Sequence, residues 1–218
     1  MIFNAWKRLL PNEFRRAFFV RCVVQFAKRQ VNDRYIKKLV ASGRPIFLEL
    51  GAGPRKGIKG WITSDTCPGA DCVIDLLKPF PFPDNSIDKI YSSHVLEHFL
   101  TSQLEFIMGE CRRVLKPGGV LSASVPNAAI YIDAYYNPEA FNPEHFCRYK
   151  PGYRFYSKID YLNYIAYMEG RHAHMFDKEN LVGMLEANGF RQVRLRDFEP
   201  DLDLPARDYE SIYVYAEK

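Results

Sequence analysis

The stretch Leu48-Glu49-Leu50-Gly51-Ala52-Gly53 decides the fold of this 218-residue chain. It continues an apolar run that starts at Pro45, so a short buried strand is expected to end in a tight turn. Glycines at the carboxyl end of a strand let backbone amides approach a ligand closely. The next glycine is Gly57, so the spacing is GxGxxxG and differs from the GxGxxG fingerprint of nicotinamide-binding folds.

Short strands and helices alternate outward from this turn. The strands are expected at residues 45–50, 61–65, 72–76, 87–92, 120–125, 192–198 and 211–216. One helix is expected to begin with the capping-box pair Ser102 and Glu105 and to stop at 116–119, and another to run from Asp177 to Gly189. The alternation predicts an α/β fold with a mostly parallel, Rossmann-like sheet and helices on both faces.

Polar residues close the second, third and fourth of these strands, the fourth with Ser92-Ser93-His94, at the edge where such sheets bind ligands. Asp65 closes the second, where a carboxylate suits the two hydroxyls of a ribose. Asp75 and Leu76 close the third, where they would receive an adenine amino group and pack on its ring. The alternative for both acids is a plain turn-capping role.

Together with further motifs, these residues resemble the class I methyltransferases, in particular small bacterial-type enzymes similar to the ubiquinone and biotin-synthesis methyltransferases. The matching segments are residues 49–53, 81–88, 93–98 and 113–119. The resemblance implies a seven-stranded sheet with an antiparallel last strand and S-adenosylmethionine as cofactor. It also implies a cofactor-binding set, which is Glu49, Gly51, Ala52, Gly53, Asp65, Asp75, Leu76 and Ser93.

One spacing departs from this pattern. Only residues 54–60 separate Gly53 from Trp61, too few for a full crossover helix. Either the first helix is vestigial, or the second strand, and with it Asp65, is shifted.

Histidines next to the expected methionine end are the catalytic candidates. His94 and His98 flank Glu97, and either is expected to take a proton from the acceptor as general base. The alternative is that Glu97 and His98 only form the first turn of a helix. No metal site is expected, because no cysteine or carboxylate completes the local pair His172 and His174.

Two regions flank or interrupt the expected catalytic domain, which spans residues 45–218. Residues 1–44 read as a basic amphipathic helical extension, and residues 1–45 hold eleven Lys/Arg and two acids. Such a helix either packs on the domain or contacts an anionic surface such as a membrane. Residues 128–170 hold nine of the fourteen tyrosines and are expected to form an aromatic-rich lid, with a packing subdomain or a dimer contact as alternatives.

These observations predict a methyltransferase acting on a small-molecule, glycan or lipid-linked acceptor. A nucleic-acid methyltransferase is the first rival, but Ser92-Ser93-His94-Val95 stands where base-modifying enzymes carry Asn/Asp-Pro-Pro-aromatic. The second rival is a non-catalytic cofactor-binding module. Scattered cysteines and the lack of a long apolar run indicate a cytoplasmic protein, peripheral to the inner membrane surface if the basic helix binds lipid.

Overall fold

The computed structural model describes residues 30–53, 57–58, 60–67 and 69–218, and the chain divides into two compact units between Gly43 and Arg44. In the first unit, residues 30–41 form a helix. The basic residues expected to contact a membrane, Arg21, Lys28 and Arg29, lie outside the described residues. Among the described helices, none has the length and apolarity needed to cross a bilayer.

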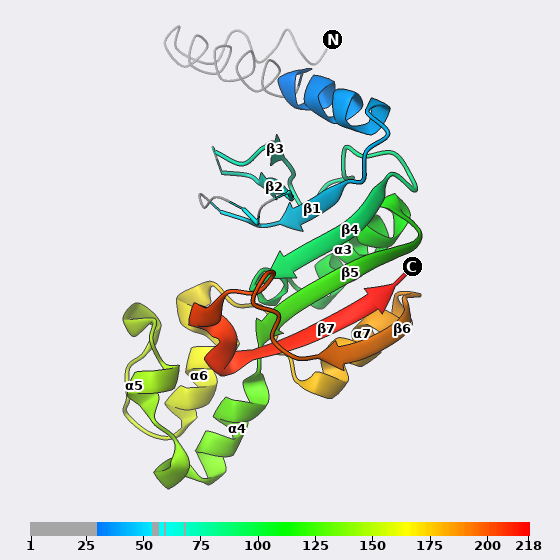
Figure 1. Cartoon of the computed structure of the whole chain (residues 1–218). Helices are drawn as coiled ribbons and strands as arrows, with labels where there is room; N and C mark the ends of the chain where they lie inside the picture. The colour runs from blue at the N-terminus through cyan, green and yellow to red at the C-terminus, as the bar shows by residue number, and fades with distance from the viewer. Residues whose placement is uncertain (1–29, 54–56, 59, 68) are drawn as a thin grey trace, which may run out of the picture. The chain divides into compact units, whose positions relative to one another are not determined.

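The second unit is built on a seven-stranded sheet with the order β3-β2-β1-β4-β5-β7-β6 (Figure 1). Strand β7 runs antiparallel to both of its neighbours, and the other described pairings are parallel. The predicted Rossmann-like α/β fold with an antiparallel last strand is therefore confirmed. The strands are β1 (Phe47–Leu50), β2 (Ile62–Asp65), β3 (Cys72–Val73), β4 (Ile87–Ser93), β5 (Leu115–Pro126), β6 (Arg191–Arg196) and β7 (Ser211–Glu217).

Two long helices, α3 (Thr101–Val114) and α7 (Lys178–Ala187), lie behind the sheet in Figure 1 and bury apolar stripes against it. The predicted cap of α7 is confirmed, because the Asp177 side chain accepts a hydrogen bond from the Asn180 amide at 2.8 Å. The predicted capping box of α3 is wrong. Gln103 Oε1 accepts from the Leu100 amide at 2.8 Å, so the helix starts at Thr101, two residues earlier than a Ser102 cap allows.

In the part of the chain that the structure describes, the face of β1 and β4 that carries Glu49 and Tyr91 is covered by a loop segment and not by crossover helices. In the described parts of the connections β1–β2, β2–β3 and β3–β4 there is no helix. Leu48 pairs with Ile62 and Leu50 with Ser64, so β2 lies where it was expected and the first helix is the feature that is reduced. Residues 200–205, from the β6–β7 connection, lie over Glu49 and Tyr91 on this face.

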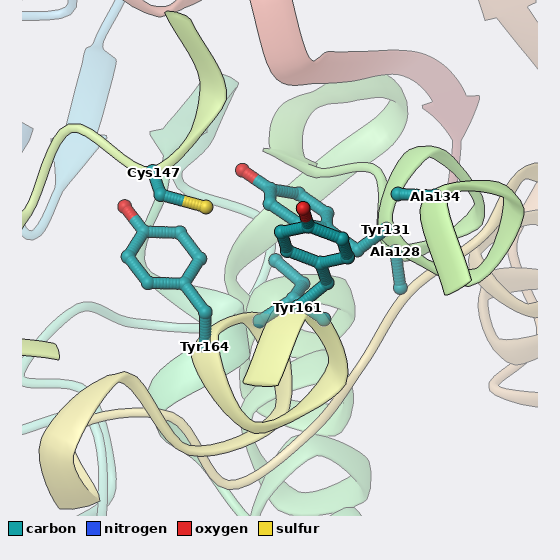
Figure 2. Packing of buried hydrophobic residues seen from close by; sticks show 7 residues of the cluster. Ala128, Tyr131, Ala134, Cys147, Tyr161 and Tyr164 are labelled. Atoms are coloured by element: carbon teal, nitrogen blue, oxygen red, sulfur yellow. The ribbon is translucent and has the colours of Figure 1, made fainter. Parts of the chain in front are cut away.

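Residues 128–170 form a small helical unit beyond the carboxyl ends of β4 and β5 (Figure 1). Its helices are α4 (Ala128–Tyr136), α5 (Pro143–Phe146) and α6 (Ile159–Tyr167), with short 3-10 turns at 138–140, 150–152 and 168–170. Figure 2 shows its core, in which Tyr131, Tyr161 and Tyr164 are buried around Cys147. The Tyr131 and Tyr164 ring centroids are 5.6 Å apart, so much of this aromatic content packs the unit itself.

Candidate active site

The two glycines of the turn after β1 have different surroundings. Gly51 and Gly53 have φ values of 63° and 65°, a left-handed conformation that favours glycine. A Cβ on Gly51 would lie 2.5 Å from Val95 Cγ2, so this glycine lets the turn after β4 pack closely. A Cβ on Gly53 would meet nothing within 4 Å, so open space adjoins the backbone there.

Asp65 ties this turn to the end of β2. Its Oδ2 accepts a hydrogen bond from the Gly53 amide at 2.9 Å, and its Oδ1 accepts from the Cys67 amide at 2.8 Å. Burial raises the pKa of the Asp65 carboxyl, but these amides, Cys67 first, outweigh it and hold the pKa below its usual value. The predicted neighbours Gly53 and Asp65 are thus brought together, and Asp65 also caps a turn.

Asp75 and Leu76 follow β3 on the same edge, since the Ile74 amide donates to the Asp65 carbonyl at 3.3 Å. Asp75 accepts from the Leu77 amide at 3.1 Å and pairs with Lys78 at 2.7 Å. Lys78 lowers the pKa of the Asp75 carboxyl, against a smaller opposing effect of burial. Asp75 therefore carries a negative charge at neutral pH beside the buried Leu76.

A cavity of about 470 Å³ adjoins the turn on the face that lacks crossover helices. Glu49 and Ala52 line it from the β1 side, Tyr91 lines it from β4, and residues 200–205 close it from the β6–β7 connection. Ligand pockets for small molecules have volumes of roughly 300–1,000 Å³. The cavity therefore has the size of a small-molecule site.

A buried ion pair holds this covering segment in place. Arg196 Nη1 and Nη2 donate to Asp203 Oδ2 and Oδ1 at 2.5 and 2.8 Å, and the Tyr91 hydroxyl donates to Asp203 Oδ1 at 2.9 Å. The Asp203 side chain is fully buried. Sequence reasoning missed this cluster because Tyr91 and Asp203 are 112 residues apart and neither belongs to a motif.

The turn after β4 brings Ser93 and His94 to the glycine turn. Ser93 Oγ accepts from Ser124 Oγ at 3.0 Å, and His94 adopts a left-handed φ of 52°. His94 Nε2 lies 2.7 Å from Ser211 Oγ, whose own proton goes to the Arg207 carbonyl at 2.7 Å. His94 Nε2 is therefore the donor of its bond to Ser211, and its side chain is only 8% exposed.

Three further histidines, His98, His172 and His174, lie in or next to the segments that meet at the Glu97 backbone. His98 is exposed, its Nδ1 donates to the Arg171 carbonyl at 2.8 Å, and its ring is 5.3 Å from that of His172. His172 donates to the Ile165 carbonyl, and burial lowers its pKa. His174 bonds to Asn180 instead, so the residues that the structure describes include no cluster of three or more potential metal ligands.

Two buried glutamates complete the neighbourhood. Glu97, in the 3-10 turn Leu96–His98, is 2% exposed, and burial raises its pKa to about 8. Glu210 accepts hydrogen bonds from the Tyr131 and Tyr209 hydroxyls at 2.5 and 2.8 Å, and burial raises its pKa also. In the sequence, Glu97 was interpreted only as the residue between the two candidate histidines, or with His98 as the first turn of a helix.

Comparisons with known proteins match this arrangement. A family model described as a methyltransferase domain matches residues 63–123, which include Asp65, Asp75 and the turn after β4. A probable S-adenosylmethionine-dependent methyltransferase of Mycolicibacterium smegmatis is 41% identical over 69 residues. Over these segments the chain is similar to S-adenosylmethionine-dependent methyltransferases, as the resemblance in the sequence predicted. The methyl donor that this similarity indicates is S-adenosylmethionine.

The extent of these matches differs between sequence and structure. The sequence match covers 32% of this chain and 25% of the M. smegmatis relative. A solved S-adenosylmethionine-dependent methyltransferase of Mesorhizobium loti is 16% identical with a TM-score of 0.51, over 83% of this chain and 96% of that one. Phosphoethanolamine N-methyltransferase 2 of Haemonchus contortus is 13% identical with a TM-score of 0.50, over 85% and 52%. The structural likeness, at such low identity, concerns the fold, and it extends over more than four fifths of the chain.

Proposed function

We propose that this chain binds S-adenosylmethionine at the glycine turn and transfers its methyl group to a small-molecule, glycan or lipid-linked acceptor. The observation that carries the proposal is the contact between Gly53 and Asp65 beside open space and a cavity of about 470 Å³. When bound, the cofactor supplies an electrophilic methyl group on a positively charged sulfur.

The residues around the turn fit such a ligand. Asp65 Oδ1 accepts the Cys67 amide and the Thr66 hydroxyl, whereas Oδ2 accepts the Gly53 amide. A carboxylate has about four lone-pair sites, so Oδ2 retains capacity for a ribose hydroxyl. We assign Asp75 and Leu76 to the adenine, and Glu49, Ala52 and Ser93 to the methionine side. Gly51 lets the turn after β4 approach the same space.

Positioning and exclusion of water carry much of the catalysis in a direct transfer. The helical unit at 128–170 is proposed to cover the acceptor, and residues 200–205 to shield the donor. Of the two proposed histidines, His98 keeps a lone pair at Nε2 because Nδ1 donates to Arg171. His94 uses Nε2 to hold Ser211, so we assign it to positioning the turn and keep His98 as the exposed proton acceptor.

Calorimetric titration of the purified protein with S-adenosylmethionine tests the proposal, with a reduced nicotinamide cofactor as the negative ligand. Gly53→Val should abolish binding because it fills the open space, and Asp65→Ala should weaken it by about tenfold or more, the loss of one charged hydrogen-bonding group. Micromolar binding would justify a screen of acceptors by labelled methyl transfer. A folded protein that does not bind would refute the proposal.

We further propose that the basic N-terminal extension contacts anionic membranes. Replacing Arg21, Lys28 and Arg29 by Gln should abolish sedimentation with anionic vesicles while zwitterionic vesicles stay unbound. Unchanged sedimentation of the variant would remove this part of the proposal.

A further inference from the structure

The turn that carries Glu97 borders the proposed donor site. Strands β1 and β4 are parallel neighbours, and Leu50 at the end of β1 pairs with Ser92 near the end of β4. Val95, in the turn that follows, packs so closely on Gly51 that a Cβ there would be only 2.5 Å away. Glu97 comes two residues later, in the 3-10 turn Leu96–His98, so the turn that packs on Gly51 leads directly into the segment that carries this carboxyl.

The carboxyl of Glu97 is buried with one oxygen unsatisfied. Its residue is 2% exposed, and Oε2 has no hydrogen-bond partner. Oε1 lies 3.7 Å from His94 Nδ1, beyond hydrogen-bonding range. Burial outweighs the hydrogen bond that the carboxyl accepts from its own backbone amide, so the neutral acid is the favoured form and the pKa rises to about 8.

Charged neighbours do not remove the cost of this burial. Arg207 favours the ionised form of Glu97 and Glu210 opposes it, both by less than the effect of burial. His94 Nδ1 bears a proton only in the imidazolium form, because Nε2 holds the proton donated to Ser211. The Ala173 and His174 amides donate to the Glu97 carbonyl at 2.8 and 3.1 Å, which fixes the backbone beneath the carboxyl.

We propose that Glu97 is a donor-linked proton acceptor: neutral in the free protein, and ionised when the positively charged methyl donor binds beside it. The inference rests on the proposed function. In this step the O–H bond of the carboxyl breaks, its electron pair stays on oxygen, and the proton passes to the buffer. The resulting carboxylate balances the sulfonium charge and is a second base, besides the exposed His98, for the proton of an acceptor hydroxyl or amine.

Proton release on binding is directly measurable by calorimetry at pH 7 in two buffers of different ionisation enthalpy. With a pKa of about 8, Glu97 is about nine-tenths protonated at pH 7, so wild-type protein should release about 0.9 proton per S-adenosylmethionine bound. S-adenosylhomocysteine lacks the sulfonium charge and should release less than half as much. Between pH 5.5 and 7.0, S-adenosylmethionine affinity should rise about tenfold per pH unit.

Glu97→Gln should bind S-adenosylmethionine with no proton release and with affinity independent of pH over this range. Glu186→Gln is the matched control, since Glu186 is an exposed carboxylate on α7 and its loss should leave the release unchanged. Glu97→Asp keeps a carboxyl and should restore part of the release. If the Gln variant does not fold, the role of Glu97 is tested by two other measurements. These are the difference in proton release between S-adenosylmethionine and S-adenosylhomocysteine on wild-type protein, and the release by the Asp variant.

The outcomes separate this inference from the proposed function. Wild-type protein that binds the donor without releasing a proton, or a Gln variant that releases it as the wild type does, overturns the role of Glu97 only. Equal release with both ligands also overturns it, because the sulfonium charge would then have no part. Failure of folded wild-type protein to bind the donor refutes the proposed function, and the role of Glu97 falls with it.

Discussion

The Arg196–Asp203 ion pair offers a sharp test of how the cavity is closed. In Asp203→Asn the guanidinium of Arg196 would lose its bidentate partner at a position where its side chain is 9% exposed. Breaking a buried ion pair on one side costs about 3–5 kcal/mol. Arg196 retains Ser122 Oγ at 3.0 Å and the Asp197 carbonyl at 2.9 Å as acceptors, so we expect a loss near the lower end, about 3 kcal/mol.

Urea unfolding followed by circular dichroism measures this loss, and limited proteolysis reports whether the β6–β7 connection opens. Asp201→Asn, an exposed change two residues away, is the control and should stay within about 0.5 kcal/mol of wild type. Arg196→Met alone and combined with Asp203→Asn completes a double-mutant cycle, for which contacting charged residues give coupling energies of about 0.5–3 kcal/mol. A loss below about 1 kcal/mol, or additive effects in the cycle, would refute the reasoning.

Three further predictions concern neighbouring features. Gly51→Ala should destabilise the protein by about 1–3 kcal/mol in urea unfolding, because its Cβ meets Val95 at 2.5 Å, whereas Gly183→Ala in helix α7, with open space around it, should be neutral or stabilising; equal effects would contradict the close approach. Tyr131→Phe should cost about 1–3 kcal/mol by removing a hydrogen bond to the buried Glu210, while Tyr156→Phe, at 86% exposure, should change nothing measurable. Burial raises the pKa of Glu97 in the folded state to about 8, so the native protein holds an extra proton and its stability falls as pH rises from about 4.5 towards 8. The free energy of unfolding of Glu97→Gln, relative to wild type, should therefore rise by about 3 kcal/mol between pH 4.5 and 7. A difference that does not change with pH would contradict a buried neutral acid.

The sequence carried the fold because its signals are local. A strand that ends in glycines, a helix begun by Asp177 and stopped at Asn188, and an apolar stripe each lie within a few consecutive residues. Even the error at Ser102 was local, since the Gln103 side chain caps the Leu100 amide and begins the helix two residues earlier. Such features need no knowledge of which segments meet in space.

The site was predictable only where it follows strand ends. Gly53 and Asp65 are twelve residues apart, and parallel strands bring their ends to one edge. Glu210 and Tyr131 are 79 residues apart, and nothing in either segment indicates the other. The ionisation of Glu97 depends on burial by such distant segments, so its pKa could not be inferred from the motif that contains it.

The short connection after Gly53 links these points. Because residues 54–60 cannot supply a full helix, the face of β1 and β4 that carries Glu49 and Tyr91 needs another cover. Residues 200–205 lie over that face, held by Asp203 to Tyr91 and Arg196. Further along the same β6–β7 connection, Arg207 donates a hydrogen bond to the Ser93 carbonyl, and the charges of Arg207 and Glu210 act on the Glu97 carboxyl. A segment that replaces a missing helix therefore also sets the charge environment of the proposed transfer site, and loosening it in Asp203→Asn should change donor affinity as well as stability.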